Sequence, residues 1–291
     1  MKVSTYILEA FTKDGAGGNA AGVVLDTQHV NEEDMQAIAS DLNVSETAFL
    51  FSSTVADYQI RYFTPAEEVD LCGHATVALF SLLKQRNEIK EGSYIIETRA
   101  GLLKVKIDRN NRVFVQQNLP QFLEIIPPES IERSLNISSD MLVEDLPIQI
   151  VSTGLRDIII PIKTRLDLLR IQPNMNEIAE ISKKYGVIGY HVFTLDTLHN
   201  SSAHCRNFAP VIDIPEESAT GTSNAALACY LVDHGYGEAD QSHHTFYFEQ
   251  GYSLGKPSEI MVQLFTKDRR ISNVYVGGYS SMVTKQKEFG L

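Results

Sequence analysis

The sequence has few cysteines, no long apolar run and no cluster of basic residues. Its three cysteines are odd in number and widely spaced, which is typical of reduced thiols rather than of a disulfide framework. No stretch approaches the roughly 18 consecutive apolar residues that a membrane-spanning helix needs. The start of the chain alternates like a strand and lacks the pattern of a signal peptide. We therefore expect a cytoplasmic protein that has no contact with a membrane.

Signatures of nucleotide and nucleic-acid binding are also absent. The net charge is −12 and no group of lysines or arginines offsets it, so binding to nucleic acid is not expected. The phosphate-binding pattern G-x-x-x-x-G-K-[ST] does not occur. The glycine-rich segment 14–19 lacks the full G-x-G-x-x-G fingerprint, which argues against a dinucleotide cofactor.

The chain of 291 residues is long enough for two domains, and its two halves resemble each other. Residues 58–68 are similar to residues 203–217, and each segment is followed by a glycine, Gly73 or Gly221, that opens an apolar helix. This order predicts a duplicated domain, although the general likeness of βα units is an alternative explanation. We expect domains at residues 1–120 and 121–275, with residues 276–291 as a candidate to pack with the first. A duplicated fold is expected to bind its ligand in the cleft between the halves.

Hydrophobic periodicity predicts the main elements of the first half. A helix with Asn31 as its N-cap is expected over residues 31–42, and a second helix over residues 74–84. Strands are expected at residues 3–11, 20–25, 48–52, 58–63, 94–98 and 102–107.

Glu46 is the first candidate for chemistry, because it lies between a helix end and a strand among small hydroxyl and apolar residues. Partial burial would raise its pKa towards ~6–7, the useful range for a general base. The alternative is a solvent-facing glutamate at a strand start, which this segment taken alone favours.

Two glycine-opened helix starts carry further candidates. His74 follows Gly73 and is a candidate acid, base or hydrogen-bond donor. Asp70, Cys72 and His74 alternate, but a structural zinc site usually needs four ligands and no further ligand group has the right spacing, so no metal is expected. Before Gly221, the acidic pair that includes Glu217 either serves the helix dipole or forms a carboxylate beside an anion site, and both interpretations stay open.

Several motifs in a fixed order resemble the PhzF (phenazine biosynthesis-like) family, whose relatives include diaminopimelate epimerase. The resembling stretches are residues 18–23, 45–49, 63–65, 68–76, 206–210, 217–221, 250–258 and 276–278. The resemblance implies an α+β fold of two pseudo-symmetric domains, each a mixed, mostly antiparallel sheet wrapped around a central helix. It also implies a cofactor-independent isomerase that acts on a small molecule, with a homodimer as a candidate assembly.

The resemblance implies roles for single residues as well. Glu46 matches the family glutamate that moves a proton between carbons of a dihydro-hydroxyanthranilate in the phenazine enzyme, and His74 and Glu217 match its helpers. The residues that match substrate-binding positions are Asn19, Gly73, Gly221 and Thr222. Glu217 replaces a family aspartate and Thr222 a family serine, so the pocket differs and the sequence does not name the substrate.

Two other functions remain open at this point. The epimerase relatives use two thiols, but here Cys72 precedes Gly73 while Thr220 precedes Gly221. A threonine hydroxyl cannot replace a thiol as a base, which disfavours a two-cysteine racemase. An epimerase that uses Cys72 with another group, and a non-catalytic protein that binds a metabolite, are the alternatives.

Overall fold

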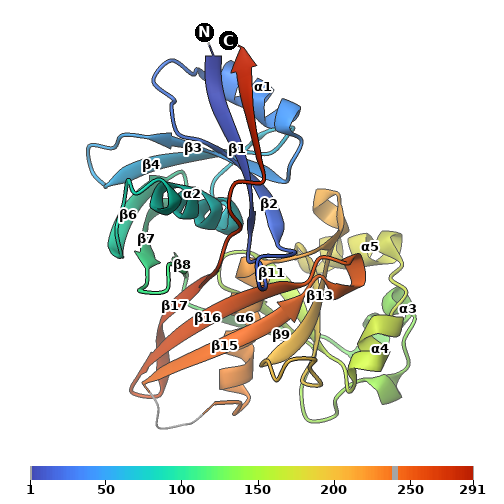
Figure 1. The fold of residues 1–291 in the computed structure, drawn as a ribbon. Helices are drawn as coiled ribbons and strands as arrows, with labels where there is room; N and C mark the ends of the chain where they lie inside the picture. Colours follow the sequence, from blue (N-terminus) through green and yellow to red (C-terminus); the bar gives the residue numbers. More distant parts are fainter. Residues whose placement is uncertain (1, 238–241, 291) are drawn as a thin grey trace. The chain divides into compact units, whose positions relative to one another are not determined.

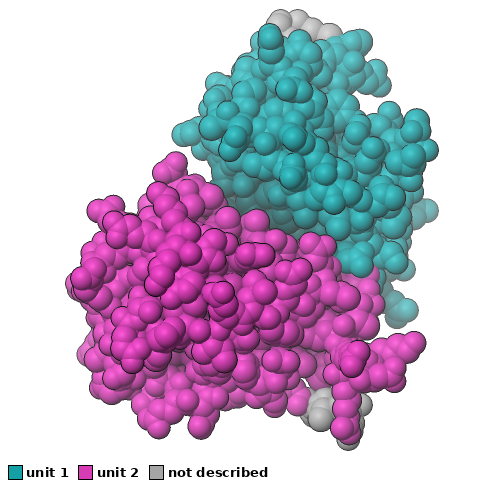
Figure 2. All heavy atoms as spheres, turned by 180° about the vertical axis from the view of Figure 1, so that it is seen from behind, with its two compact units in different colours: residues 1–116, 277–291 teal, residues 117–276 magenta. Residues whose placement is uncertain are grey.

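The computed structural model describes residues 2–237 and 242–290, and the chain forms two compact units. Unit 1 comprises residues 1–116 and 277–291, and unit 2 comprises residues 117–276 (Figure 2). The chain passes from one unit to the other within two strands, β8 (Val113–Gln117) and β17 (Arg270–Gly278). Both units consist of strands with a few helices (Figure 1), so the α+β class is confirmed. Among the described residues, no helix is long and apolar enough to cross a membrane.

Unit 1 wraps strands around one buried helix. Its further elements are β1 (Lys2–Ala10), β2 (Asn19–Val24), α1 (Glu32–Leu42), β3 (Glu46–Phe51), β4 (Tyr58–Phe63), β5 (Glu68–Val69), α2 (Gly73–Gln85), β6 (Gly92–Thr98), β7 (Gly101–Ile107) and β18 (Lys285–Gly290). Strand β1 pairs antiparallel with β2 and β18, β2 runs parallel to β3, and β4 runs antiparallel to β3 and parallel to β6. Helix α2 packs against β1, β2 and β3, and residues 74–83 are all buried. A helix that is hydrophobic all round belongs in a core, so α2 is the central helix of this unit.

Unit 2 repeats this plan with extra helices. Its elements are β9 (Gln121–Ile125), η1 (Pro128–Ser130), α3 (Glu132–Leu135), η2 (Ser139–Met141), β10 (Gln149–Ser152), β11 (Arg156–Pro161), α4 (Arg165–Arg170), α5 (Met175–Tyr185), β12 (Gly189–Thr194), β13 (Ala203–Ala209), η3 (Pro210–Ile212), β14 (Ile214–Glu217), α6 (Gly221–Asp233), β15 (His243–Gln250), η4 (Tyr252–Leu254) and β16 (Ser258–Lys267). The central helix is α6, which is buried and packs against β10, β11, β12 and β16.

The strand registers agree with the internal repeat. Strand β11 runs parallel to β12, β12 antiparallel to β13 and β13 parallel to β15, in the same order as β2, β3, β4 and β6. Arg61 stands opposite Phe49, and Arg206 stands opposite Val192. Counting three residues back along β3 and β12 places Glu46 and Gly189 at equivalent positions. The strand scaffold therefore repeats, but Glu46 has no carboxyl counterpart in unit 2, because Gly189 stands at the equivalent position.

Local signals predicted the helices well. Helix α1 begins after Asn31, whose side chain accepts a hydrogen bond from the Asp34 N–H at 2.9 Å, while the Asp34 carboxylate accepts one from the Asn31 N–H at 3.2 Å. This reciprocal capping box satisfies two backbone donors that a helix start leaves unpaired. The expected start of β3 at residue 48 was wrong, because the strand begins at Glu46, which pairs with Ala21 of β2. The strand ladder thus holds the Glu46 backbone in place.

Candidate active site

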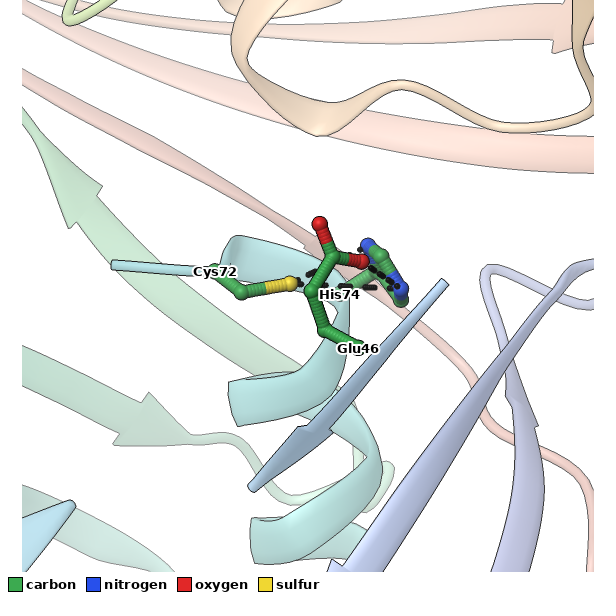
Figure 3. Close-up of side chains that lie close together, drawn as sticks. All are labelled: Glu46, Cys72 and His74. Atoms are coloured by element: carbon green, nitrogen blue, oxygen red, sulfur yellow. Dashed lines mark hydrogen bonds and ion pairs between the residues drawn. The ribbon is translucent and has the colours of Figure 1, made fainter. Parts of the chain in front are cut away.

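Three side chains from two separate segments of the sequence meet at the start of α2 (Figure 3). Glu46 comes from the first residue of β3, whereas Cys72 and His74 come from the two sides of Gly73. The Glu46 Oε2 atom lies 3.2 Å from the His74 Nε2 atom, and the Cys72 Sγ atom lies 3.3 Å from His74 Nδ1. His74 and Cys72 are buried, and 19% of the Glu46 side chain is exposed.

The backbone of α2 positions this group. Cys72 is the N-cap of the helix and has extended dihedrals, so its side chain turns back over the first turn. The Cys72 sulfur accepts a hydrogen bond from the Ala75 N–H at 3.4 Å, and its carbonyl accepts one from the Thr76 hydroxyl at 2.7 Å. The thiol is therefore held in a fixed place beside Glu46.

Burial changes the acidity of Glu46. It raises the pKa of this carboxyl from 4.5 to about 7, while the side-chain hydrogen bond with Cys72 lowers the pKa by a smaller amount. Removal from water disfavours the charged carboxylate, which explains the direction. A carboxyl group with a pKa near neutrality can both accept and release a proton at physiological pH. The solvent-facing alternative for Glu46 is therefore wrong.

Space is available next to these side chains. A Cβ atom built on Gly73 meets no heavy atom of the described residues within 4 Å, apart from its two chain neighbours and the nearby backbone of its own helix. The first N–H groups of an α-helix have no partner within the helix and favour anionic ligands. The start of α2 can therefore receive an anionic group close to Glu46.

The same three residues bear on metal binding. Glu46, Cys72 and His74 offer ligand atoms that all lie within 4.8 Å of one another. However, Glu46 lies against Nε2 of the imidazole whereas the sulfur lies closer to Nδ1, at 3.3 Å against 3.9 Å for Nε2. The carboxylate oxygen and the sulfur nevertheless both lie near Nε2, at 3.2 and 3.9 Å, so these three ligand atoms are close enough to hold one ion. Asp70, which alternates with Cys72 and His74 in the sequence, pairs with Arg99 at 3.3 Å.

The remaining candidates lie on other elements. Asn19 is buried at the start of β2, two residues before the Ala21 partner of Glu46. In unit 2, Glu217 ends β14 and Gly221 is the first residue of α6. The Glu217 carboxylate accepts a hydrogen bond from the Thr220 hydroxyl at 2.5 Å.

Thr222, the fourth substrate-binding candidate, has its polar groups engaged within unit 2. Its hydroxyl contacts the Gln117 side chain at 3.4 Å, and its carbonyl accepts a hydrogen bond from the Thr153 hydroxyl at 3.1 Å.

Unit 2 contains a short sequence pattern that is known from serine nucleophiles. Residues 251–255 have the G-x-S-x-G spacing of a nucleophile elbow. An elbow requires a sharp turn from a strand into a helix, but this segment forms only the single turn η4. The Ser253 hydroxyl donates to Glu216, and Glu216 is also bound by Arg206 at 2.8 Å. Ser253 is therefore hydrogen-bonded to a carboxylate that is already paired with Arg206, and it does not lie on a turn from a strand into a helix.

The sequence reasoning did not single out Asp157, a second buried carboxyl group. It lies on β11, is 2% exposed and accepts a hydrogen bond from the Ser223 hydroxyl at 2.7 Å. The pKa of Asp157 is raised from 3.8 to about 7, mainly by burial; the hydrogen bond from Ser223 opposes this rise and the charge of Glu217 adds to it. No short motif marks this residue, because it resembles any polar residue at the start of an apolar strand.

The fold and this group of side chains define a class of proteins in which a sheet surrounds a central helix with a tuned carboxyl group at its start. The family model PhzC-PhzF, described as phenazine biosynthesis-like protein, matches residues 8–286. The chain belongs to this family.

Curated relatives and solved structures agree with this membership. An uncharacterized isomerase of Clostridium acetobutylicum is 35% identical, with 98% of each chain covered. The Escherichia coli protein YddE, also named an uncharacterized isomerase, is 34% identical, with 96% of this chain and 95% of YddE covered. A PhzF family protein of Bacillus anthracis has a TM-score of 0.91 and 29% identity over the whole of both chains. A hydroxyproline epimerase from Agrobacterium vitis shares the fold alone, with a TM-score of 0.64, 13% identity, and 99% of this chain and 92% of that chain covered.

Proposed function

We propose that this protein is an isomerase that moves a proton on a small carboxylate-bearing metabolite by carboxyl acid/base catalysis, without a cofactor. The observation that supports this proposal most directly is the state of Glu46. Its carboxyl group has a pKa of about 7 and lies 3.2 Å from His74 at the start of α2. The names of the relatives support the reaction class, since those at 34–35% identity are named uncharacterized isomerases.

In this proposal Glu46 takes a proton from a carbon atom of the substrate and returns it to another carbon. The carboxylate form is the base, and the carboxylic acid formed in the first step is the acid of the second step. Because the pKa is near 7, both forms are populated at physiological pH, so the same group can serve as base and as acid. His74 contacts Glu46 directly and is the proposed partner for holding or relaying the proton.

The substrate carboxylate is proposed to bind at the helix start, where Gly73 leaves open space. Asn19, Gly221, Thr222 and Glu217 stay predictions of the family resemblance for substrate binding and proton relay. Their positions on β2, β14 and α6 support these roles only through the motif match.

An epimerase that pairs two thiols is the less favoured function. Burial raises the pKa of Cys205 and of Cys229 far above the usual range, so neither thiol is available as a base. Thr220 occupies the N-cap of α6, the place that Cys72 occupies in α2. Cys72 therefore has no thiol partner at the equivalent position, and its contact with Glu46 fits a role in adjusting that carboxyl group.

The test is exchange of carbon-bound hydrogen in heavy water, followed by proton NMR. Candidate substrates are small carboxylates with an acidic C–H bond, including the dihydro-hydroxyanthranilate of the phenazine enzyme. For a carboxylate that exchanges with wild-type protein, Glu46→Gln should slow exchange by about 10²–10⁴-fold. Glu67→Gln is the matched control, because Glu67 is exposed in the same unit and should leave the rate unchanged. An unchanged rate in Glu46→Gln refutes the proposal, and loss of exchange in Cys72→Ala alone would favour thiol chemistry.

A further inference from the structure

The N-cap of α6 is unusual because its side chain does not cap the helix. Threonine at this position normally accepts a hydrogen bond from an N–H of the first turn, which is worth about 1 kcal/mol. Thr220 makes no such bond. Its hydroxyl instead contacts Glu217 Oε2 at 2.5 Å and Gln250 Nε2 at 3.0 Å. The Thr220 hydroxyl therefore contacts Glu217, a candidate site residue, instead of capping α6.

The buried Gln250 side chain determines which way the Thr220 hydroxyl points. Its amide nitrogen donates to the Glu217 backbone carbonyl at 2.9 Å, and since a carbonyl only accepts, this bond identifies the nitrogen. The same nitrogen also donates to Thr220 Oγ1, so the hydroxyl hydrogen remains for Glu217 Oε2. The amide oxygen accepts from the Thr220 N–H at 3.2 Å and from Asn224 Nδ2 at 2.7 Å. The amide group is thus satisfied on both sides and cannot flip without losing these bonds.

A second layer of buried polar groups supports Gln250. Asn224 Nδ2 donates to the Thr220 carbonyl at 2.9 Å, which identifies its nitrogen, so Asn224 Oδ1 accepts from His191 Nε2 at 3.2 Å. Asn207 Nδ2 faces His191 Nδ1 at 3.2 Å, so that nitrogen is an acceptor. His191 is therefore neutral with its proton on Nε2, and burial lowers its pKa to about 4, which agrees with this tautomer. The side-chain donors of His191, Asn224, Gln250 and Thr220 therefore form one continuous series of hydrogen bonds that ends at Glu217.

We propose that Thr220, oriented by Gln250, is a positioning residue that holds the Glu217 carboxylate and donates a hydrogen bond to its Oε2 atom. This inference rests on the proposed role of Glu217 in the isomerase reaction. A hydrogen bond to a charged carboxylate is shorter and stronger than one between neutral groups, which agrees with the 2.5 Å distance. Thr220 thus takes a task different from that of Cys72, whose sulfur does cap its helix.

Two other charged groups lie near Glu217. The Asp157 carboxyl interacts with it electrostatically, and its pKa of about 7 means that its charge changes over the range of the test. Arg206 binds Glu216 instead, through two hydrogen bonds of 2.9 and 2.8 Å. The titration of Glu217 must therefore be compared between variants that leave Asp157 and Arg206 in place.

The experiment is a pH titration of the Glu217 side-chain carboxyl carbon by ¹³C NMR, with its signal assigned by Glu217→Gln. Thr220→Val keeps the shape but removes the donor, so the midpoint should rise by roughly one pH unit, because the charged form loses a hydrogen bond. Thr220→Ser keeps the hydroxyl and should restore the wild-type midpoint. Gln250→Met should move the midpoint in the same direction by less. Thr222→Val, a neighbouring threonine bonded to Gln117, should leave this midpoint unchanged.

If Thr220→Val and Thr220→Ser both titrate like the wild type, the proposal is overturned. Thr220→Ala provides the same test should the valine variant fail to fold, since it also removes the hydroxyl. The titration needs no substrate, so it can succeed even if the isomerase function fails. If that function holds as well, Thr220→Val should shift the pH profile of hydrogen exchange by the same amount, and Thr220→Ser should not.

Discussion

The protonation of Glu46 is the most direct consequence of the site geometry. Burial raises its pKa from 4.5 to about 7, a difference of about 2.5 that corresponds to about 3 kcal/mol. The hydrogen bond with Cys72 opposes this rise. Replacing Cys72 with alanine removes that bond and leaves the carboxyl group in its buried place, so the pKa of Glu46 should rise further, above 7.

The measurement is the ¹³C chemical shift of the Glu46 carboxyl carbon as a function of pH, with the signal assigned by its loss in Glu46→Gln. We expect a midpoint near 7 in the wild type, a higher midpoint in Cys72→Ala and an intermediate one in Cys72→Ser, whose hydroxyl can still donate. Cys229→Ala is the matched control, because this buried thiol belongs to α6 of the other unit. It should leave the midpoint unchanged.

The sign of the effect also predicts a change in stability. Because folding raises the pKa of Glu46, its protonated form is favoured in the folded state, and this contribution is fully present below pH 4.5 and is lost as the pH rises through 7. A wild-type midpoint between 4 and 5 would refute the argument from burial. A midpoint that does not respond to Cys72→Ala would refute the role assigned to the thiol.

Three further predictions concern stability. Burial raises the pKa of Asp157 from 3.8 to about 7, so the free energy of unfolding should fall by up to about 4 kcal/mol between pH 4 and pH 7. Denaturant titrations at each pH should show a smaller fall for Asp157→Asn. An equal fall in both proteins would contradict this prediction. In Gly189→Ala the new Cβ would lie 1.9 Å from the Phe208 carbonyl oxygen, so the unfolding free energy should drop by about 2 kcal/mol or more, whereas Gly73→Ala meets no atom within 4 Å and should cost far less. Asn31→Ala removes the capping box of α1, so the free energy of unfolding should fall by about 1 kcal/mol, measured by thermal unfolding. Hydrogen exchange on a substrate should not change, and equal melting temperatures would contradict this prediction.

Much of the fold could be predicted because its signals are local. The capping residues at Asn31 and the glycine before His74 marked the starts of α1 and α2 within one residue. The apolar content of α2 and α6 indicated buried helices, and the repeated segments around Arg61 and Arg206 indicated two related units. These features depend on residues a few positions apart, so the sequence displays them directly.

The candidate site was only partly predictable. Glu46, Cys72 and His74 were each singled out, but their spacing in the sequence does not reveal that β3 places the carboxylate against the imidazole. Alternation of Asp70, Cys72 and His74 left a metal clasp as a disfavoured alternative, and the structure pairs Asp70 with Arg99, because alternation along a loop does not determine where its side chains point.

By itself the sequence determined the elements, the repeat and the family, since capping, periodicity and motif order are properties of neighbouring residues. Only the tertiary structure decided which residues can act as acids and bases. The pKa of Glu46 depends on the burial of its side chain in the folded unit, and the orientation of Thr220 depends on the buried amide of Gln250, 30 residues away in the chain. The two units share one scaffold, but different side chains lie at the start of each central helix. Long-range packing determines the acidity and the hydrogen bonds of these side chains.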